Sequence, residues 1–117
     1  MPQIIEVAPR ELVRIAPADA GKLEFSTNGG RSWLLRCQKA SVGSFVDLLV
    51  VGRELLAVTD KGIAYSTNGG RSWLSRVQAT SNTGKFLTLM LDGATLLAQT
   101  EKGLFFSTNQ GRSWMKR

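Results

Sequence analysis

Short apolar segments alternate with glycine-containing turns along the chain, and this pattern recurs with a period of about 40 residues. In the middle of the chain the apolar segments lie near 45–51, 55–59, 62–66 and 73–77. Each is rich in Val, Leu, Ile and Phe and too short for a typical helix, so we expect β-strands. The segments are separated by residues that favour turns, namely Gly52-Arg53, Asp60-Lys61-Gly62 and Asn68-Gly69-Gly70.

One short sequence motif occurs once in each copy of the repeat. FSTNGGRSW at 25–33 recurs as YSTNGGRSW at 65–73 and as FSTNQGRSW at 106–114. Upstream, ELLAVTDKGIAYS from Glu54 aligns without a gap with TLLAQTEKGLFFS from Thr95. A period of about 40 residues with four strands per copy is typical of a β-propeller blade. We therefore predict an all-β protein with three propeller blades of four antiparallel strands, at about 1–38, 39–79 and 80–117 of a single domain 1–117.

The number of blades predicts that the chain associates with a second copy of itself. The segments near Phe45 and Phe86 are apolar on both faces, which fits strands covered by sheets on both sides. Propellers usually close with four to eight blades, so three blades leave apolar faces uncovered. We expect two chains to form a six-bladed homodimer, because closed twofold symmetry is the commonest arrangement of homo-oligomers. The alternative is that the chain is a fragment of a larger propeller.

The repeated Ser-Thr-Asn-Gly-Gly-Arg-Ser-Trp resembles the Asp-box, or BNR repeat, whose pattern is Ser-x-Asp-x-Gly-x-Thr-Trp. The resemblance implies a structural hairpin between the third and fourth strands of each blade. Asn in place of Asp keeps an oxygen that accepts hydrogen bonds from turn amides, but it removes the charge and weakens a role in cation binding. We expect the glycine to have a positive φ and the Trp to cover the hairpin. The matching residues are Ser26, Asn28, Gly30, Trp33, Ser66, Asn68, Gly70, Trp73, Ser107, Asn109, Gly111 and Trp114.

Arginines recur at equivalent positions of the three copies, and the formal net charge of the chain is +6. One arginine per hairpin and two from the first turns are expected on one face of the blades: Arg31, Arg71, Arg112, Arg10 and Arg53. Three more, Arg36, Arg76 and Arg117, follow each Trp by three residues on the outer strands. We interpret the hairpin arginines first as rim residues inherited with the duplicated blade, with stems that can pack on the Trp. The alternative is a rim that binds a polyanion or an acidic protein.

The residues available for catalysis are few. The absence of His excludes a His-ligated metal site, and Cys37, expected to be a buried thiol, has no partner for an internal disulfide. The only Tyr, Tyr65, occupies a repeat position held elsewhere by Phe25 and Phe106, so we expect it to pack rather than act as a sialidase-like nucleophile. No carboxylate pair suggests glycoside hydrolysis.

We therefore predict a non-enzymatic protein-interaction or structural module that needs no cofactor or metal. A carbohydrate-binding, lectin-like propeller is the alternative, although the polar connections after Gln38 and Gln78 lack the aromatic residues that would stack on sugars. The N-terminus has no apolar run of signal-peptide length, and the longest apolar run, 48–51, is too short to cross a bilayer. We expect a soluble protein that does not contact membranes, and its location is cytoplasmic or unknown from the sequence.

Overall fold

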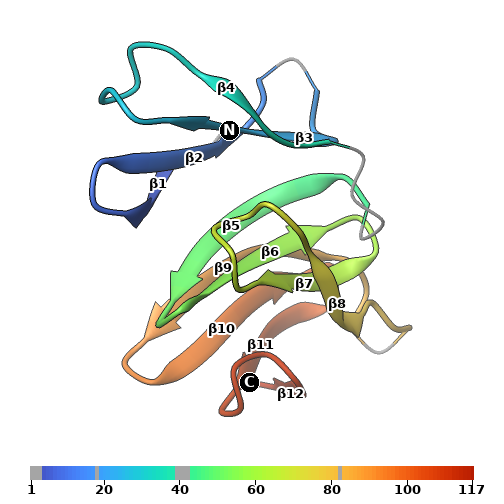
Figure 1. The fold of residues 1–117 in the computed structure, drawn as a ribbon. Helices are drawn as coiled ribbons and strands as arrows, with labels where there is room; N and C mark the ends of the chain where they lie inside the picture. Colours follow the sequence, from blue (N-terminus) through green and yellow to red (C-terminus); the bar gives the residue numbers. More distant parts are fainter. Residues whose placement is uncertain (1–3, 18, 39–42, 82) are drawn as a thin grey trace.

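Three four-stranded antiparallel sheets follow one another along the chain in the computed structural model, which describes residues 4–17, 19–38, 43–81 and 83–117 (Figure 1). In each sheet the strand order in space is the order in the sequence. No residue of the described ranges is helical. The first sheet contains β1 (Ile4–Ala8), β2 (Glu11–Ile15), β3 (Lys22–Ser26) and β4 (Leu34–Gln38). The second contains β5 (Phe45–Val51), β6 (Glu54–Thr59), β7 (Gly62–Ser66) and β8 (Leu74–Gln78). The third contains β9 (Phe86–Asp92), β10 (Thr95–Thr100), β11 (Gly103–Ser107) and β12 (Met115–Lys116).

The sheets are arranged as propeller blades. The first strands approach one another, since β5 contacts both β1 and β9. Figure 1 shows the three sheets as successive layers from the blue N-terminal sheet to the orange and red C-terminal one. Within each sheet the turn between the first two strands and the turn between the last two lie at the same edge, because the strands alternate in direction. We call this edge, with its three repeated hairpins, the box edge. The predicted all-β propeller fold is confirmed.

The hydrophobic core lies between the sheets. At the first junction, Val13 and Leu23 of the first sheet are buried with Leu48, Leu55 and Trp73 of the second. The second junction is built in the same way by Leu56, Ile63, Phe86, Leu89 and Leu96. Tyr65 packs against this second cluster, as expected of a packing residue. Cys37 is half-buried against the first cluster, and burial raises the pKa of its thiol.

The third sheet has one of the uncovered apolar faces that a chain of three blades is predicted to leave. In β9, Phe86 and Leu89 are buried, but Leu87, Met90 and Leu91 are exposed. Met90 pairs with Leu97 on the outer face of the third sheet, and no further sheet covers this face in the described structure. Leu87 is exposed at the bulge of β9, as Val46 is in β5. The sheet therefore presents apolar side chains to solvent.

Candidate functional site

The three hairpins at the box edge share one hydrogen-bond network. In the first, the Ser26 hydroxyl donates to Asn28 Oδ1 at 2.8 Å and accepts from the backbone N–H groups of Gly30, at 2.9 Å, and Asn28, at 3.3 Å. The same contacts, with the same distances, recur in the other hairpins through Ser66, Asn68, Gly70, Ser107, Asn109 and Gly111. The serine is buried in every copy, so it satisfies turn amides where water has little access.

The asparagine uses both ends of its amide. Asn28 Oδ1 accepts from the Ser32 N–H at 3.0 Å, and Asn28 Nδ2 donates to Ser32 Oγ at 2.8 Å. The equivalent Asn–Ser pairs are Asn68–Ser72 and Asn109–Ser113. A carboxylate has no N–H to donate, so the Asn makes a contact that an Asp cannot make in the same direction. The recurrence of Asn with Ser four residues later was the available sequence signal for this pair.

The glycine and the tryptophan complete each hairpin. Gly30, Gly70 and Gly111 have φ angles of 89°, 93° and 88°, so the predicted positive φ is confirmed. The indole N–H of each Trp donates to the carbonyl of that glycine, at 2.9–3.1 Å. Gln110 replaces the preceding glycine in the third copy and still adopts a φ of 63°. That position accepts a side chain in an uncommon left-handed conformation.

The tryptophans differ in what covers them. Trp73 is buried and packs on Phe45 with ring centroids 5.3 Å apart, and Trp114 packs on Phe86 at 5.6 Å. Trp33 instead carries the guanidinium of Arg14, 4.2 Å from its ring centre. The second and third hairpins are thus joined to the core by aromatic contacts, whereas the Trp of the first hairpin packs against the charged side chain of Arg14.

Arginines surround the hairpins at the box edge. All five predicted rim residues, Arg10, Arg31, Arg53, Arg71 and Arg112, are exposed. Arg71 donates to the Asn68 carbonyl at 2.8 Å and Arg112 to the Asn109 carbonyl at 3.1 Å, so both lie back along their own hairpins. In the described structure the guanidinium groups that stack on rings belong to Arg14, Arg36 and Arg76, which corrects the expected packing of hairpin arginines on Trp.

Two arginines that we counted with the basic excess are buried between blades. The Arg36 side chain is 2% exposed, pairs with Glu11 at 2.8 Å, and donates to the Gly69 carbonyl of the next blade at 3.3 Å. The Arg76 side chain is 4% exposed, with both Nη atoms 2.8 Å from Glu54 oxygens. Sequence reasoning missed this role, although a Glu at the start of the second strand and this Arg recur together.

Arg76 contacts the third blade in the same way that Arg36 contacts the second. Its Nη1 donates to the Gln110 carbonyl at 3.0 Å, and its guanidinium lies 4.0 Å from the Tyr65 ring centre. The hydrogen bond from Arg76 holds the pKa of Glu54 below its ordinary value, with further help from the charge of Arg112. We call Arg36 and Arg76 the clamp arginines, because each joins its own blade to the hairpin of the next.

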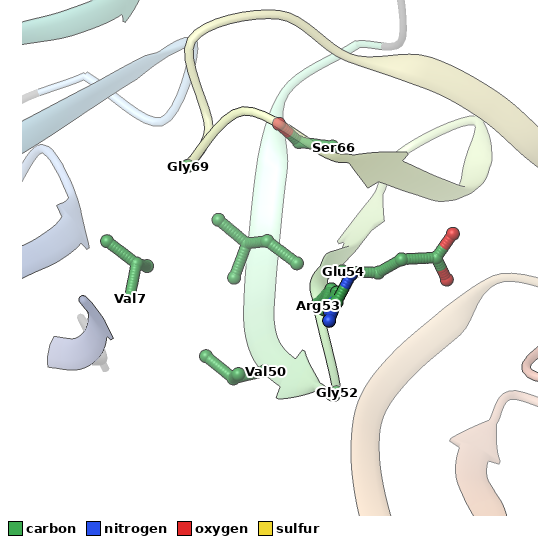
Figure 2. A pocket seen from close by; sticks show the side chains of 8 residues that line it. Val7, Val50, Gly52, Arg53, Glu54, Ser66 and Gly69 are labelled. Carbon is green, nitrogen blue, oxygen red and sulfur yellow. The ribbon is translucent and has the colours of Figure 1, made fainter.

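A small recess opens at the box edge between the first and second sheets (Figure 2). Its volume is about 80 Å³. Val7, Val50 and Leu55 supply apolar walls, and Arg53 and Glu54 supply polar ones. Ligand pockets usually measure about 300–1,000 Å³, so this recess has room for one small side chain and not for a sugar or a cofactor.

Two classes of feature are missing from the described residues. The part of the chain that the structure describes contains no group of three or more Cys, Asp or Glu side chains placed to hold a metal ion. Across the same residues, no helix is long and apolar enough to cross a membrane.

Comparison with known proteins supports the fold. No protein-family model and no curated protein matches the chain. YCF48 bound to a D1 peptide is 17% identical, with a TM-score of 0.71 over 97% of this chain and 39% of that one. YCF48 from Cyanidioschyzon merolae is 20% identical, with a TM-score of 0.71 over 97% of this chain and 35% of its own. The GH74 xyloglucanase from Xanthomonas campestris is 19% identical, with a TM-score of 0.64 over 92% and 17%. The chain spans less than two fifths of each of these proteins, and the likeness shows a β-propeller fold.

Proposed function

We propose that the chain is a non-enzymatic β-propeller module that associates with a second copy and binds an acidic segment of a partner protein at the box edge. The observation that carries the binding role is the charge at this edge. Arg10, Arg31, Arg53, Arg71 and Arg112 are exposed there. Among the described residues, no carboxylate lies within 4.0 Å of any of these five guanidinium groups.

The arginines elsewhere differ in this respect. Arg14 pairs with Glu24 at 2.8 Å, and the clamp arginines pair with Glu11 and Glu54. Their charges are therefore compensated within the protein. The five rim arginines form no such ion pair, although the charge of Arg112 acts on Glu54, and an anionic partner in contact with several of them gains affinity from multivalency rather than from one strong contact. Arginine also binds carboxylates through two parallel hydrogen bonds, which suits an Asp- or Glu-rich segment.

The shape of the edge favours a peptide over a sugar. The recess of about 80 Å³ accepts one small side chain beside the exposed Arg53. YCF48, which shares the fold, has been solved with a D1 peptide bound, so a propeller of this kind can hold part of another protein. At the box edge, these two observations favour a protein partner over a sugar.

The non-enzymatic assignment is supported by the structural contacts of the carboxylates. Three of them form the ion pairs with arginine, and Asp47 accepts from the N–H groups of Leu48 and Leu89. Asp60 and Glu101 accept from the backbone N–H groups that precede β5 and β9, at 2.9 Å each. Carboxylates held in this way are poorly suited to the paired acid and nucleophile roles of a glycoside hydrolase.

The test is a titration of a fluorescently labelled Asp- and Glu-rich peptide by anisotropy, over a series of salt concentrations. The triple variant Arg31→Gln, Arg71→Gln and Arg112→Gln should bind about tenfold more weakly, because each exposed ion pair contributes roughly 0.2–1 kcal/mol. The matched control removes three positive charges from the opposite edge by Lys22→Gln, Lys61→Gln and Lys102→Gln, and should bind like the wild type.

Three outcomes would contradict this proposal. Equal weakening by the two triple variants would show that net charge, and not the box edge, drives binding. Binding of heparin that exceeds binding of the peptide at equal charge would identify a polyanion-binding protein instead. Specific binding on a glycan array, retained by the arginine variant, would favour the lectin-like alternative.

A further inference from the structure

The two junctions inside the chain define which positions face each other between blades. Ile15, near the end of β2, lies in one buried cluster with Ala57 of β6. One blade further on, Val58 of β6 lies in one buried cluster with Ala98 of β10. Both junctions therefore place a branched aliphatic residue of one blade near an alanine of the next. The strand pairing identifies Ile15, Val58 and Gln99 as equivalent, because they pair with Leu23, Ile63 and Leu104.

The outer face of the third sheet carries a polar residue at this position. Gln99 is exposed where the inner junctions have Ile15 and Val58. Around it the face remains apolar: Met90 is 43% exposed, and Leu97, Leu104 and Phe106 are half-buried.

The outer face of the first sheet carries the matching change. Arg14 occupies the position of Ala57 and Ala98, and its carboxylate partner Glu24 occupies the position of Ala64. Arg14 and Glu24 form an ion pair at 2.8 Å, beside Ile4, which is 54% exposed, and the half-buried Trp33. Both free faces are thus polar at the one position where both inner junctions are apolar.

We infer that the outer face of the third sheet packs on the outer face of the first sheet of a second copy, with Gln99 against the partner's Arg14 and the partner's Glu24. This inference rests on the proposed self-association and assigns its contacts. The amide of Gln99 can both donate and accept hydrogen bonds, so it can bond to the Arg14–Glu24 ion pair of the partner. An apolar side chain at this position would remove water from the ion pair and offer it no hydrogen bond in return. One chain carries both faces, so two copies joined by a twofold axis satisfy all four faces and form a ring of six blades.

The clamp series supports the same junction independently. Arg36 donates to the Gly69 carbonyl and Arg76 to the Gln110 carbonyl, each in the hairpin of the next blade. Arg117 is the third member by repeat position, and it is exposed. Thr95 replaces the glutamate that pairs with the other two. In the inferred junction the acceptor for Arg117 is the carbonyl of the partner's Gly29.

The first test is the molar mass of the full chain by light scattering after size exclusion. The chain has a mass of 12.8 kDa, so a dimer has a mass of about 26 kDa. Met90→Asp on the third sheet and Ile4→Asp on the first should each shift the protein to monomer at the same concentration. The control is Leu74→Asp on β8 of the middle blade, where the side chain is 61% exposed and outside both faces. Its mass should stay that of the wild type, and circular dichroism checks that all variants are folded.

The second test reports the pairing of the faces. In a Cys37→Ser background, Gln99→Cys and Arg14→Cys chains are treated with a short bismaleimide, separately and after mixing. Cross-linked dimer should form in the mixture and not in either chain alone, because the inferred junction joins unlike faces. A monomeric wild type would overturn both the self-association and this pairing. A dimer in which either chain cross-links to itself, or in which the mixture does not cross-link, would overturn the pairing alone. Peptide binding at the box edge is measured separately and does not depend on these outcomes.

Discussion

Removal of the Arg76 charge tests whether the clamp arginines hold neighbouring blades together. Arg76→Met keeps an unbranched stem over the Tyr65 ring and removes the guanidinium. The variant loses two contacts of 2.8 Å with the Glu54 carboxylate and one of 3.0 Å with the Gln110 carbonyl. The carboxylate then stays partly buried without its counter-ion, and the carbonyl loses a donor.

The expected cost follows from that burial. Loss of one partner from a buried ion pair usually costs about 3–5 kcal/mol. Glu54 is 19% exposed, so water can solvate part of the freed carboxylate, and we expect a loss of about 2–4 kcal/mol in the free energy of unfolding. Such a loss is a large fraction of the roughly 5–15 kcal/mol that stabilises a typical domain.

The assay is urea unfolding followed by tryptophan fluorescence at one fixed protein concentration, because association shifts the apparent stability. Arg71→Met is the matched control: Arg71 also donates to a hairpin carbonyl, but it is exposed, so its loss should change stability by less than about 0.5 kcal/mol. The double variant Arg76→Met, Glu54→Gln should be less destabilised than the sum of the two single variants, because it leaves no unpaired charge. Equal urea midpoints for Arg76→Met and Arg71→Met would show that the contacts of Arg76 do not hold neighbouring blades together.

Two further predictions concern pH and the hairpin tryptophans. The pKa of Glu54 is lowered in the folded state, so its contribution to stability is present above the pKa of the unfolded chain and is lost as pH falls through the lower folded value. Unfolding measured from pH 6 down to about 3 should show this loss, and an identical slope in Arg76→Met would contradict it. Trp73→Ala should cost about 3–5 kcal/mol, since Trp73 is buried against Phe45, while Trp33→Ala should cost less because Trp33 is only half-buried. Equal losses in melting experiments would show that the two hairpins are anchored alike.

The hairpins show how far local chemistry can be predicted. Their Ser, Asn, Gly and Trp contact one another within a few residues of chain, as between Ser26 and Gly30. Such contacts depend on backbone conformations that the residues themselves favour. The positive φ of the glycine and the position of the Trp were therefore predictable from the repeated phrase. The exposure of the five rim arginines also agrees with their position in turns.

The clamp arginines show where that reasoning stops. Arg36 and Arg76 resemble the rim arginines in sequence, since each recurs once per repeat. Their acceptors, the carbonyls of Gly69 and Gln110, are 33 and 34 residues away on the next blade. Whether a guanidinium reaches water or a neighbouring blade depends on how the sheets pack, and the pattern of a single blade does not contain that information.

The sequence by itself determined the repeat, the four strands of each copy and the hairpin chemistry, because these depend on the alternation of apolar and turn residues over short distances. Only the tertiary structure decided which side chains lie between blades. It buried the clamp arginines, left Met90 of β9 exposed, and placed Gln99 and Arg14 on the two free faces, at the positions that face each other across the inner junctions. The physical reason is that burial in a propeller is shared between sheets, so the environment of a residue is set by the face of a neighbour about 40 residues away.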